Sequence, residues 1–171
     1  PLAIRWSTTA TDGGGLVDGQ PITLTYSFIP DGTIVPNISG IENGDQPSDL
    51  FAFLDGIYGG NTATWQAVFA QVFARWSEVT GVTYVFEPND DGGTFPGLTA
   101  GLPGVIGVRG DVRISGVTLD GAGAGVLAVN YFPDVGDMVF DSANGDFYGD
   151  ISNNSLLLRN VAAHEQSLAM V

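Results

Sequence analysis

One stretch constrains the fold of this chain more than any other: NTATWQAVFAQVFARWSEVTG, residues 61–81. Its large apolar side chains recur at helical spacing, which predicts an amphipathic helix with one buried face. These side chains are Trp65, Val68, Phe69, Val72, Phe73 and Trp76. Thr62 or Thr64 can cap the start of this helix, and Gly81 follows its end. We interpret the aromatic stripe as core rather than as a ligand-binding surface.

Strand patterns surround this helix. In PITLTYSFIP, residues 21–30, apolar residues alternate with Thr and Ser, which predicts a half-buried strand. Further strands are predicted at 82–88, 111–117, 126–133 and 137–141. A short helix is predicted at 48–58, capped by Ser48 or Asp49, and a last helix is capped by Asn153 or Asn154. Residues 1–20 are expected to be an irregular leader and residues 31–49 a loop. Residues 21–171 are expected to form one layered α/β (α+β) domain, a twisted sheet carrying a long helix.

The charge balance excludes some partners. The chain has 19 acidic residues, five arginines and no lysine, for a net charge of −14. Nucleic acid and anionic membrane surfaces are therefore unsuitable partners, because both require clustered cationic side chains. Bound calcium would relieve the repulsion, since it takes carboxylate and carbonyl oxygens. The alternative is an acidic surface that only aids solubility. No apolar run is long enough to insert into a membrane.

The end of the chain reads NVAAHEQSLAMV, which places His164 and Glu165 in the last predicted helix. In the His-Glu-x-x-His motif, two histidines bind zinc and the glutamate acts on the zinc-bound water. Here Leu168 stands at the second histidine position, and His164 is the single histidine of the chain. There is also no cysteine to supply a thiolate ligand. The competing interpretation is a helix with an incidental histidine.

The segment from Gly125 to Glu165 resembles the matrixin-type metzincins, the family of the matrix metalloproteases. The strand VLAVNYFP resembles the family pattern Leu-Ala-x-x-x-Phe-Pro, and GDMVFD resembles the Gly-Asp-x-x-Phe-Asp that follows it. NNSLLLRNVAAHE resembles the run into the zinc helix. Upstream, RGDVRISGVTLDG and the strand, long helix and strand of residues 21–88 fit the family order. The resemblance covers about residues 20–165.

This resemblance implies a five-stranded mixed sheet, an active-site helix, a substrate cleft along an edge strand and a secreted zinc endopeptidase. His164 falls on the first zinc histidine and Glu165 on the catalytic glutamate. The positions that match calcium ligands of the family are Asp120, Gly121, Asp137, Asp141 and Asn144. Calcium is therefore an expected cofactor, and zinc is expected in the complete family enzyme.

Three functions remain open at this stage. The first is the N-terminal subdomain of a secreted zinc-dependent endopeptidase, inactive as the chain stands because the second and third zinc histidines are absent. The chain begins at Pro1, which we interpret as a processed or trimmed N-terminus. The second is a non-catalytic, calcium-stabilised extracellular module that binds protein or peptide along a sheet edge. A glycosidase with paired acids is the third, although the acids lie in Gly/Asn-rich loops.

Overall fold

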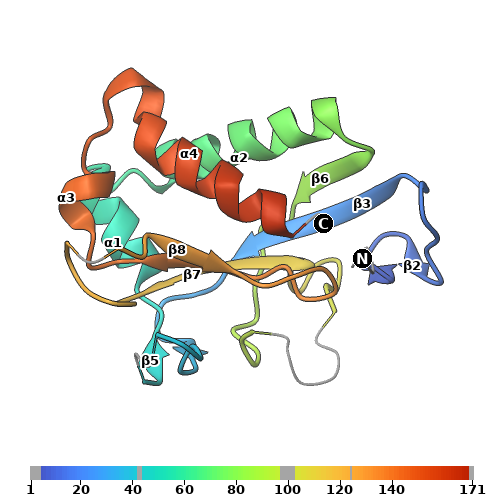
Figure 1. Cartoon of the computed structure of the whole chain (residues 1–171), viewed down its shortest axis with the longest axis horizontal. Helices are drawn as coiled ribbons and strands as arrows, with labels where there is room; N and C mark the ends of the chain where they lie inside the picture. Colours follow the sequence, from blue (N-terminus) through green and yellow to red (C-terminus); the bar gives the residue numbers. More distant parts are fainter. Residues whose placement is uncertain (1–4, 42–43, 97–102, 124, 170–171) are drawn as a thin grey trace.

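The computed structural model of the chain describes residues 5–41, 44–96, 103–123 and 125–169. Its central sheet has the strand order β6-β3-β7-β9-β8 (Figure 1). The strands are β3 (Ile22–Phe28), β6 (Val82–Phe86), β7 (Val112–Val117), β8 (Ala128–Asn130) and β9 (Met138–Asp141). All neighbours are parallel except β8, which runs antiparallel to β9. The predicted twisted five-stranded mixed sheet is therefore confirmed, and β8 is one of its two edge strands.

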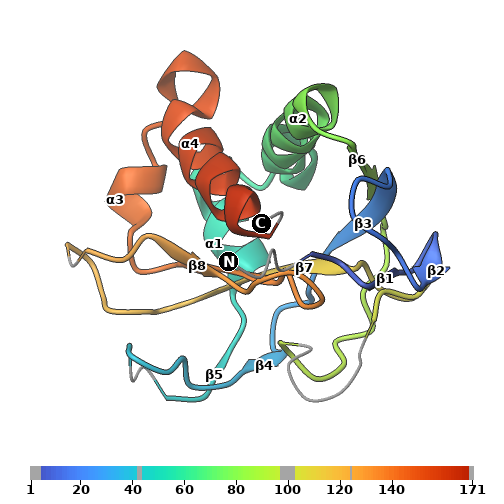
Figure 2. The same cartoon turned by 45° about the vertical axis from the view of Figure 1, so that its right-hand side comes forward.

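The helices cover one face of this sheet. The two long helices, α2 (Thr62–Val79) and α4 (Ser152–Leu168), lie side by side over it, and α1 (Leu50–Ile57) packs against β7 (Figures 1 and 2). A short helix, α3 (Gly145–Tyr148), precedes α4. The small sheet of β4 (Ile34–Val35) and β5 (Gln46–Pro47) lies on the opposite side of the central sheet (Figure 2). No helix among the described residues is long and apolar enough to cross a membrane.

The aromatic stripe of α2 forms the centre of the core, as predicted. The ring of Phe28 on β3 lies 4.9 Å from the ring of Trp65 and 5.3 Å from that of Phe69, with both pairs edge to face. Phe69 also contacts Phe140 of β9 at 5.4 Å. Edge-to-face pairs of buried rings contribute stabilisation beyond the burial of their area. The helix is therefore fixed over the middle of the sheet.

The observed N-cap agrees with the prediction at α1 and differs from it at α2 and α4. The N-cap of α2 is Asn61, whose side chain accepts from the backbone N–H of Thr64, and not Thr62 or Thr64. Asp49 is the N-cap of α1, but its side chain makes no capping bond. The N-cap of α4 is Ile151, and the predicted caps Asn153 and Asn154 lie inside the first turn with left-handed dihedral angles, a conformation that Asn adopts more readily than most residues.

Short elements appear where loops were expected. Within residues 1–20, β1 (Thr8–Thr9) and β2 (Gly13–Gly14) form a small antiparallel pair. The expected loop at 31–49 contains the β4–β5 pair, and α3, which was not predicted, lies between β9 and α4. Two-residue strands and a four-residue helix carry too little periodicity to be recognised in a sequence.

Candidate active site

The edge strand β8 has an open side. Tyr131 N–H donates to Asp137 C=O (2.9 Å), and Asp141 N–H donates to Leu127 C=O (2.8 Å). Because pairing groups alternate along an antiparallel strand, the N–H and C=O groups of Ala128 and Asn130 point away from β9. These four groups make no hydrogen bond to any described residue. Such an edge can accept an extended peptide as a further strand.

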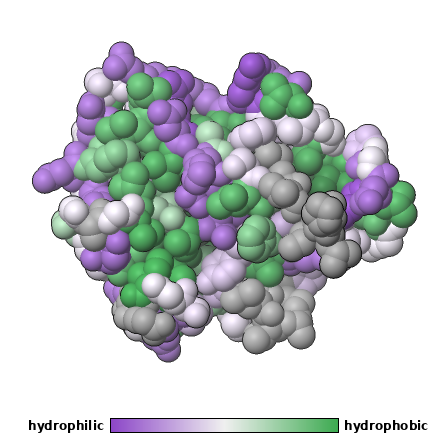
Figure 3. All heavy atoms as spheres, viewed as in Figure 1, coloured by the Kyte–Doolittle hydropathy of each residue, from purple (hydrophilic) through white to green (hydrophobic). Residues whose placement is uncertain are grey.

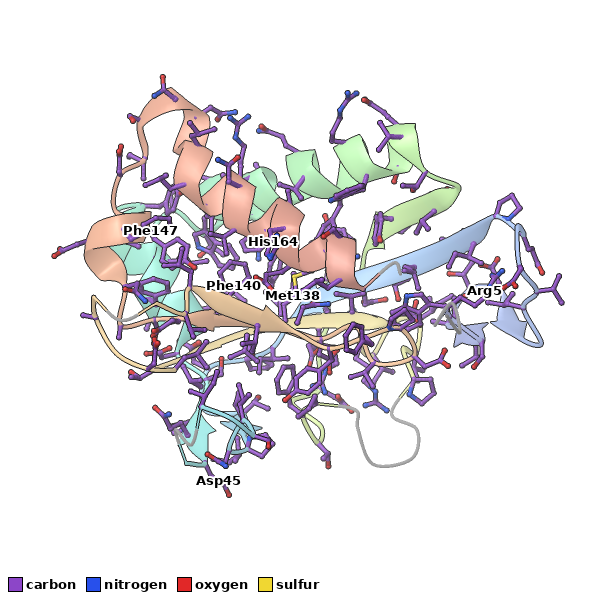
Figure 4. The ribbon with its side chains drawn as sticks, in the orientation of Figure 1. Arg5, Asp45, Met138, Phe140, Phe147 and His164 are labelled. Carbon is purple, nitrogen blue, oxygen red and sulfur yellow. The ribbon has the colours of Figure 1, made fainter. Side chains whose placement is uncertain are left out.

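The helix α4 lies beside this edge and brings two polar side chains to it. An open hollow of about 540 Å³ separates β8 from α4. Its lining residues are Gly125, Val126, Leu127, Ala128, Val129, Asn160, Val161, His164 and Glu165. His164 lies on α4 above Met138 and Phe140 of β9 (Figure 4). Apolar surface gathers on the side of α3 and β8, next to polar surface along α4 (Figure 3). We call the hollow between β8 and α4 the β8–α4 cleft.

Glu165 is a buried carboxylate in the lining of the cleft. Only 5% of its surface is exposed. Burial raises the pKa of the Glu165 carboxyl, and the charge of neighbouring His164 partly opposes that rise. No described residue donates a hydrogen bond to this carboxylate, so its oxygens remain available to water in the cleft. A carboxylate whose pKa is raised towards neutrality is suited to act as a general base and then as an acid.

Two polar groups support the floor of the cleft. The hydroxyl of Tyr148, on α3, donates to the carbonyl of Leu127 (2.7 Å). The side-chain amide of Asn130 donates to the carbonyl of Tyr131 (2.7 Å), while its Oδ1 is buried without a hydrogen-bond partner among the described residues.

The described residues do not make a zinc site by themselves. His164 is the single histidine, and zinc sites in enzymes use three protein ligands. Among the residues whose positions are described, no three His, Cys, Asp or Glu side chains lie close enough together to hold one metal ion. His164 is therefore the one histidine that lines this cleft, next to the carboxylate of Glu165.

Four of the five predicted calcium ligands, Asp120, Gly121, Asp141 and Asn144, lie at the end of β9 and in the neighbouring glycine loop. Asp141 is fully buried and accepts from the backbone N–H groups of Leu119 and Ala143. The amide of Asn144 donates to Asp141 (2.9 Å), and its oxygen accepts from Gly123 N–H (3.4 Å). Asp120 Oδ2 accepts from Val126 N–H (3.1 Å), which closes the glycine loop in which Gly121 has a φ of +93°. Protein donors therefore occupy both oxygens of Asp141.

Asp137, the remaining predicted ligand, lies elsewhere. It precedes β9, at the end of that strand opposite Asp141, and its Oδ1 accepts from the backbone N–H of Arg113 (2.8 Å). Arg113 belongs to a buried cluster that the sequence did not reveal, in which its guanidinium is paired with Asp90. An arginine in the middle of the predicted strand at 111–117 was the available signal, since a buried cation requires a partner.

No model of a known protein family matches this chain, and a search of the curated proteins finds no match.

Proposed function

We propose that this chain forms the peptide-binding cleft and supplies the general base of a secreted, matrixin-like zinc endopeptidase. The observation that carries the proposal is the position of His164 and Glu165 in the same cleft as the open edge of β8. An extended peptide on β8 would pair with the outward backbone groups of Ala128 and Asn130. One of its peptide bonds would then lie beside α4.

The chemistry assigned to the chain's own groups is hydrolysis of that peptide bond. Glu165 takes a proton from a water molecule as the water oxygen bonds to the carbonyl carbon, and then passes it to the amine nitrogen as the C–N bond breaks. Zinc, when bound, supplies a Lewis acid and lowers the pKa of its water. His164 would be one ligand of three. The activity is therefore proposed for a protein that adds further ligands to those in residues 1–171.

The test is proteolysis by the protein expressed from its complete natural reading frame. Cleavage of a quenched-fluorescence peptide library should occur, stop with a zinc chelator and return with added zinc. Glu165→Gln should lower kcat by at least about a hundredfold, because general-base catalysis contributes that much or more. Glu78→Gln, an exposed change on α2, is the matched control and should have no effect. Cleavage that survives both the chelator and Glu165→Gln would refute the proposal.

The second candidate is a non-catalytic binding module on the same fold, favoured by the presence of one histidine only. Both candidates place a peptide on β8. They differ in outcome, because the binding module would retain a peptide intact, and Glu165→Gln would leave its affinity unchanged. Recovery of uncleaved peptide after incubation with the complete protein and zinc supports the module and contradicts the endopeptidase.

Calcium binding at Asp120, Asp141 and Asn144 is part of both proposals. Carboxylate and carbonyl oxygens of the glycine loop are the ligands that calcium prefers. A ligand that binds only the folded state raises stability by about 2.7 kcal/mol at a hundredfold excess over its Kd. We expect calcium to raise the Tm, and magnesium to do so less. Asp120→Asn should remove most of this rise while Glu78→Gln preserves it. An equal rise in Asp120→Asn would refute this site.

A further inference from the structure

A second hollow lies on the other side of α4, between α4 and α2. It has a volume of about 510 Å³ and is lined by Gln71, Val72, Arg75, Trp76, Val79, Arg159, Asn160 and Ala163. Its floor is apolar, formed by Val72, Trp76 and Ala163, and Val79 at one end is 55% exposed. We call it the α2–α4 groove. Two of the five arginines of the chain lie on its walls.

Arg159 differs from the other arginines in its partners. Arg5, Arg75, Arg109 and Arg113 each have a described carboxylate within 4.0 Å. Arg159 has none among the described residues, although the chain carries 19 acidic side chains. Its Nη2 donates to the carbonyl of Asn153 (3.3 Å), and its Nε is buried with no hydrogen-bond partner in the described structure. Because Arg159 lines the open groove and has no carboxylate partner among the described residues, its guanidinium can pair with an incoming carboxylate.

We propose that the α2–α4 groove docks an acidic segment of a partner protein, with a carboxylate on Arg159 and a neighbouring apolar side chain on Trp76. Charge complementarity and the apolar floor favour this occupant. A nucleic acid or an anionic membrane extends well beyond the groove and would be repelled by the net charge of −14. A short segment escapes most of this repulsion, because charges farther than about 8–10 Å are screened at physiological salt. The proposal does not depend on zinc chemistry.

Changes to the two members of the Arg75–Glu78 ion pair should have opposite effects on the affinity for the acidic segment. It lies on the α2 wall and pairs with Glu78 at 2.6 Å, with both side chains mostly exposed. Glu78 therefore competes with an incoming carboxylate for Arg75. Removing the charge of Glu78 should strengthen docking, whereas removing the charge of Arg75 should weaken it.

The experiment uses a fluorescein-labelled peptide that alternates glutamate with leucine, and fluorescence anisotropy with the chain. Trp76 gives a second readout, since Trp6 and Trp65 are buried. Arg159→Gln should weaken binding by about tenfold and Arg75→Gln by about two- to fivefold. Glu78→Gln should strengthen it by a similar small factor. Arg5→Gln, which removes an arginine outside the groove, is the control and should leave the affinity unchanged.

Several outcomes would overturn the proposal. They are equal binding of a peptide with glutamine in place of glutamate, affinity unchanged by Arg159→Gln, tighter binding of single-stranded RNA than of the peptide, and self-association that Arg159→Gln abolishes. The last would identify a second copy of the chain as the occupant. Arg159→Lys guards against a folding defect, because it keeps the charge and should retain part of the affinity.

Discussion

Removing the buried carboxylate of Asp90 should destabilise the chain more than removing any of its exposed carboxylates. Arg113 lies on the central strand β7 with 1% of its side chain exposed, and the side chain of Asp90 is fully buried. The two form a bidentate pair, with Nε to Oδ2 at 2.9 Å and Nη2 to Oδ1 at 2.6 Å. Asp90 Oδ2 also accepts from the hydroxyl of Ser27 (2.7 Å).

The expected magnitude follows from what Asp90→Ala leaves behind. The guanidinium of Arg113 keeps its hydrogen bonds to the carbonyls of Gly93 and Thr94. It also keeps its contact with the ring of Phe95, whose centroid lies 5.6 Å away, but it loses the opposite charge with which it was paired. Breaking a buried ion pair on one side costs about 3–5 kcal/mol, because the other charge stays buried. At about 2–4 °C per kcal/mol for a chain of this size, the Tm should fall by roughly 6–20 °C.

The assay is urea denaturation at neutral pH followed by far-UV circular dichroism. The adjacent residue supplies the control, because Asp91 pairs with Arg109 while its own side chain is 40% exposed. Asp91→Ala should cost less than about 1 kcal/mol. The double change Asp90→Leu with Arg113→Met should recover much of the loss, since an apolar pair often replaces a buried ion pair without penalty. Equal costs for Asp90→Ala and Asp91→Ala would refute the reasoning.

Two further predictions concern backbone packing and pH. A Cβ on Gly110 would lie 2.6 Å from the backbone nitrogen of Ser27, so Gly110→Ala should cost about 1–3 kcal/mol by denaturation. Gly56→Ala in α1 meets no atom within 4 Å and should instead stabilise by about 0.5–1 kcal/mol; equal effects of the two changes would contradict the geometry. Because burial raises the pKa of Glu165 in the folded state, this group favours folding at low pH, and that contribution disappears as the pH rises past the raised pKa. The Tm of Glu165→Gln should therefore rise relative to the Tm of the wild type as the pH increases from about 4 to 8. A Tm difference that is constant with pH would contradict this.

The parts of the fold that the sequence predicts correctly are those with local periodicity. The aromatic stripe of α2 and the alternation in β3 each span several turns or residue pairs, which identifies the type of element. The expected half-burial of β3 was wrong, because Thr25 and Ser27 on its polar side are buried as well. The hydrogen-bond acceptor at the start of α1 was not predicted, because it is distant in the chain. At α1, the carboxylate of Asp31 accepts from the N–H groups of Phe51 and Ala52, both at 2.9 Å, although neither Ser48 nor Asp49 does so by side chain.

The part of the candidate site that could be predicted is the part that lies within one local segment of the sequence. His164 and Glu165 are neighbours in one predicted helix, and the structure places both along the β8–α4 cleft, with His164 exposed and Glu165 buried. The open groups of Ala128 and Asn130 depend on sheet order, which the local pattern of β8 does not encode. The Arg113–Asp90 pair joins residues 23 positions apart and requires the turn after β6 to fold back. Only the folded sheet brings these charges together.

Helix α4 shows how one sequence element acquires several roles once its neighbours are fixed. Residues four apart share a face of a helix, so Arg159 and Ala163 face α2 together. The next two residues, His164 and Glu165, line the β8–α4 cleft. Asn160 lines both hollows. The buried face of α4 holds Leu158, Val161 and Ala162 against the core. A shift of α4 about its axis would therefore change both hollows at once, and the core contacts that fix its rotation also fix the direction of Glu165.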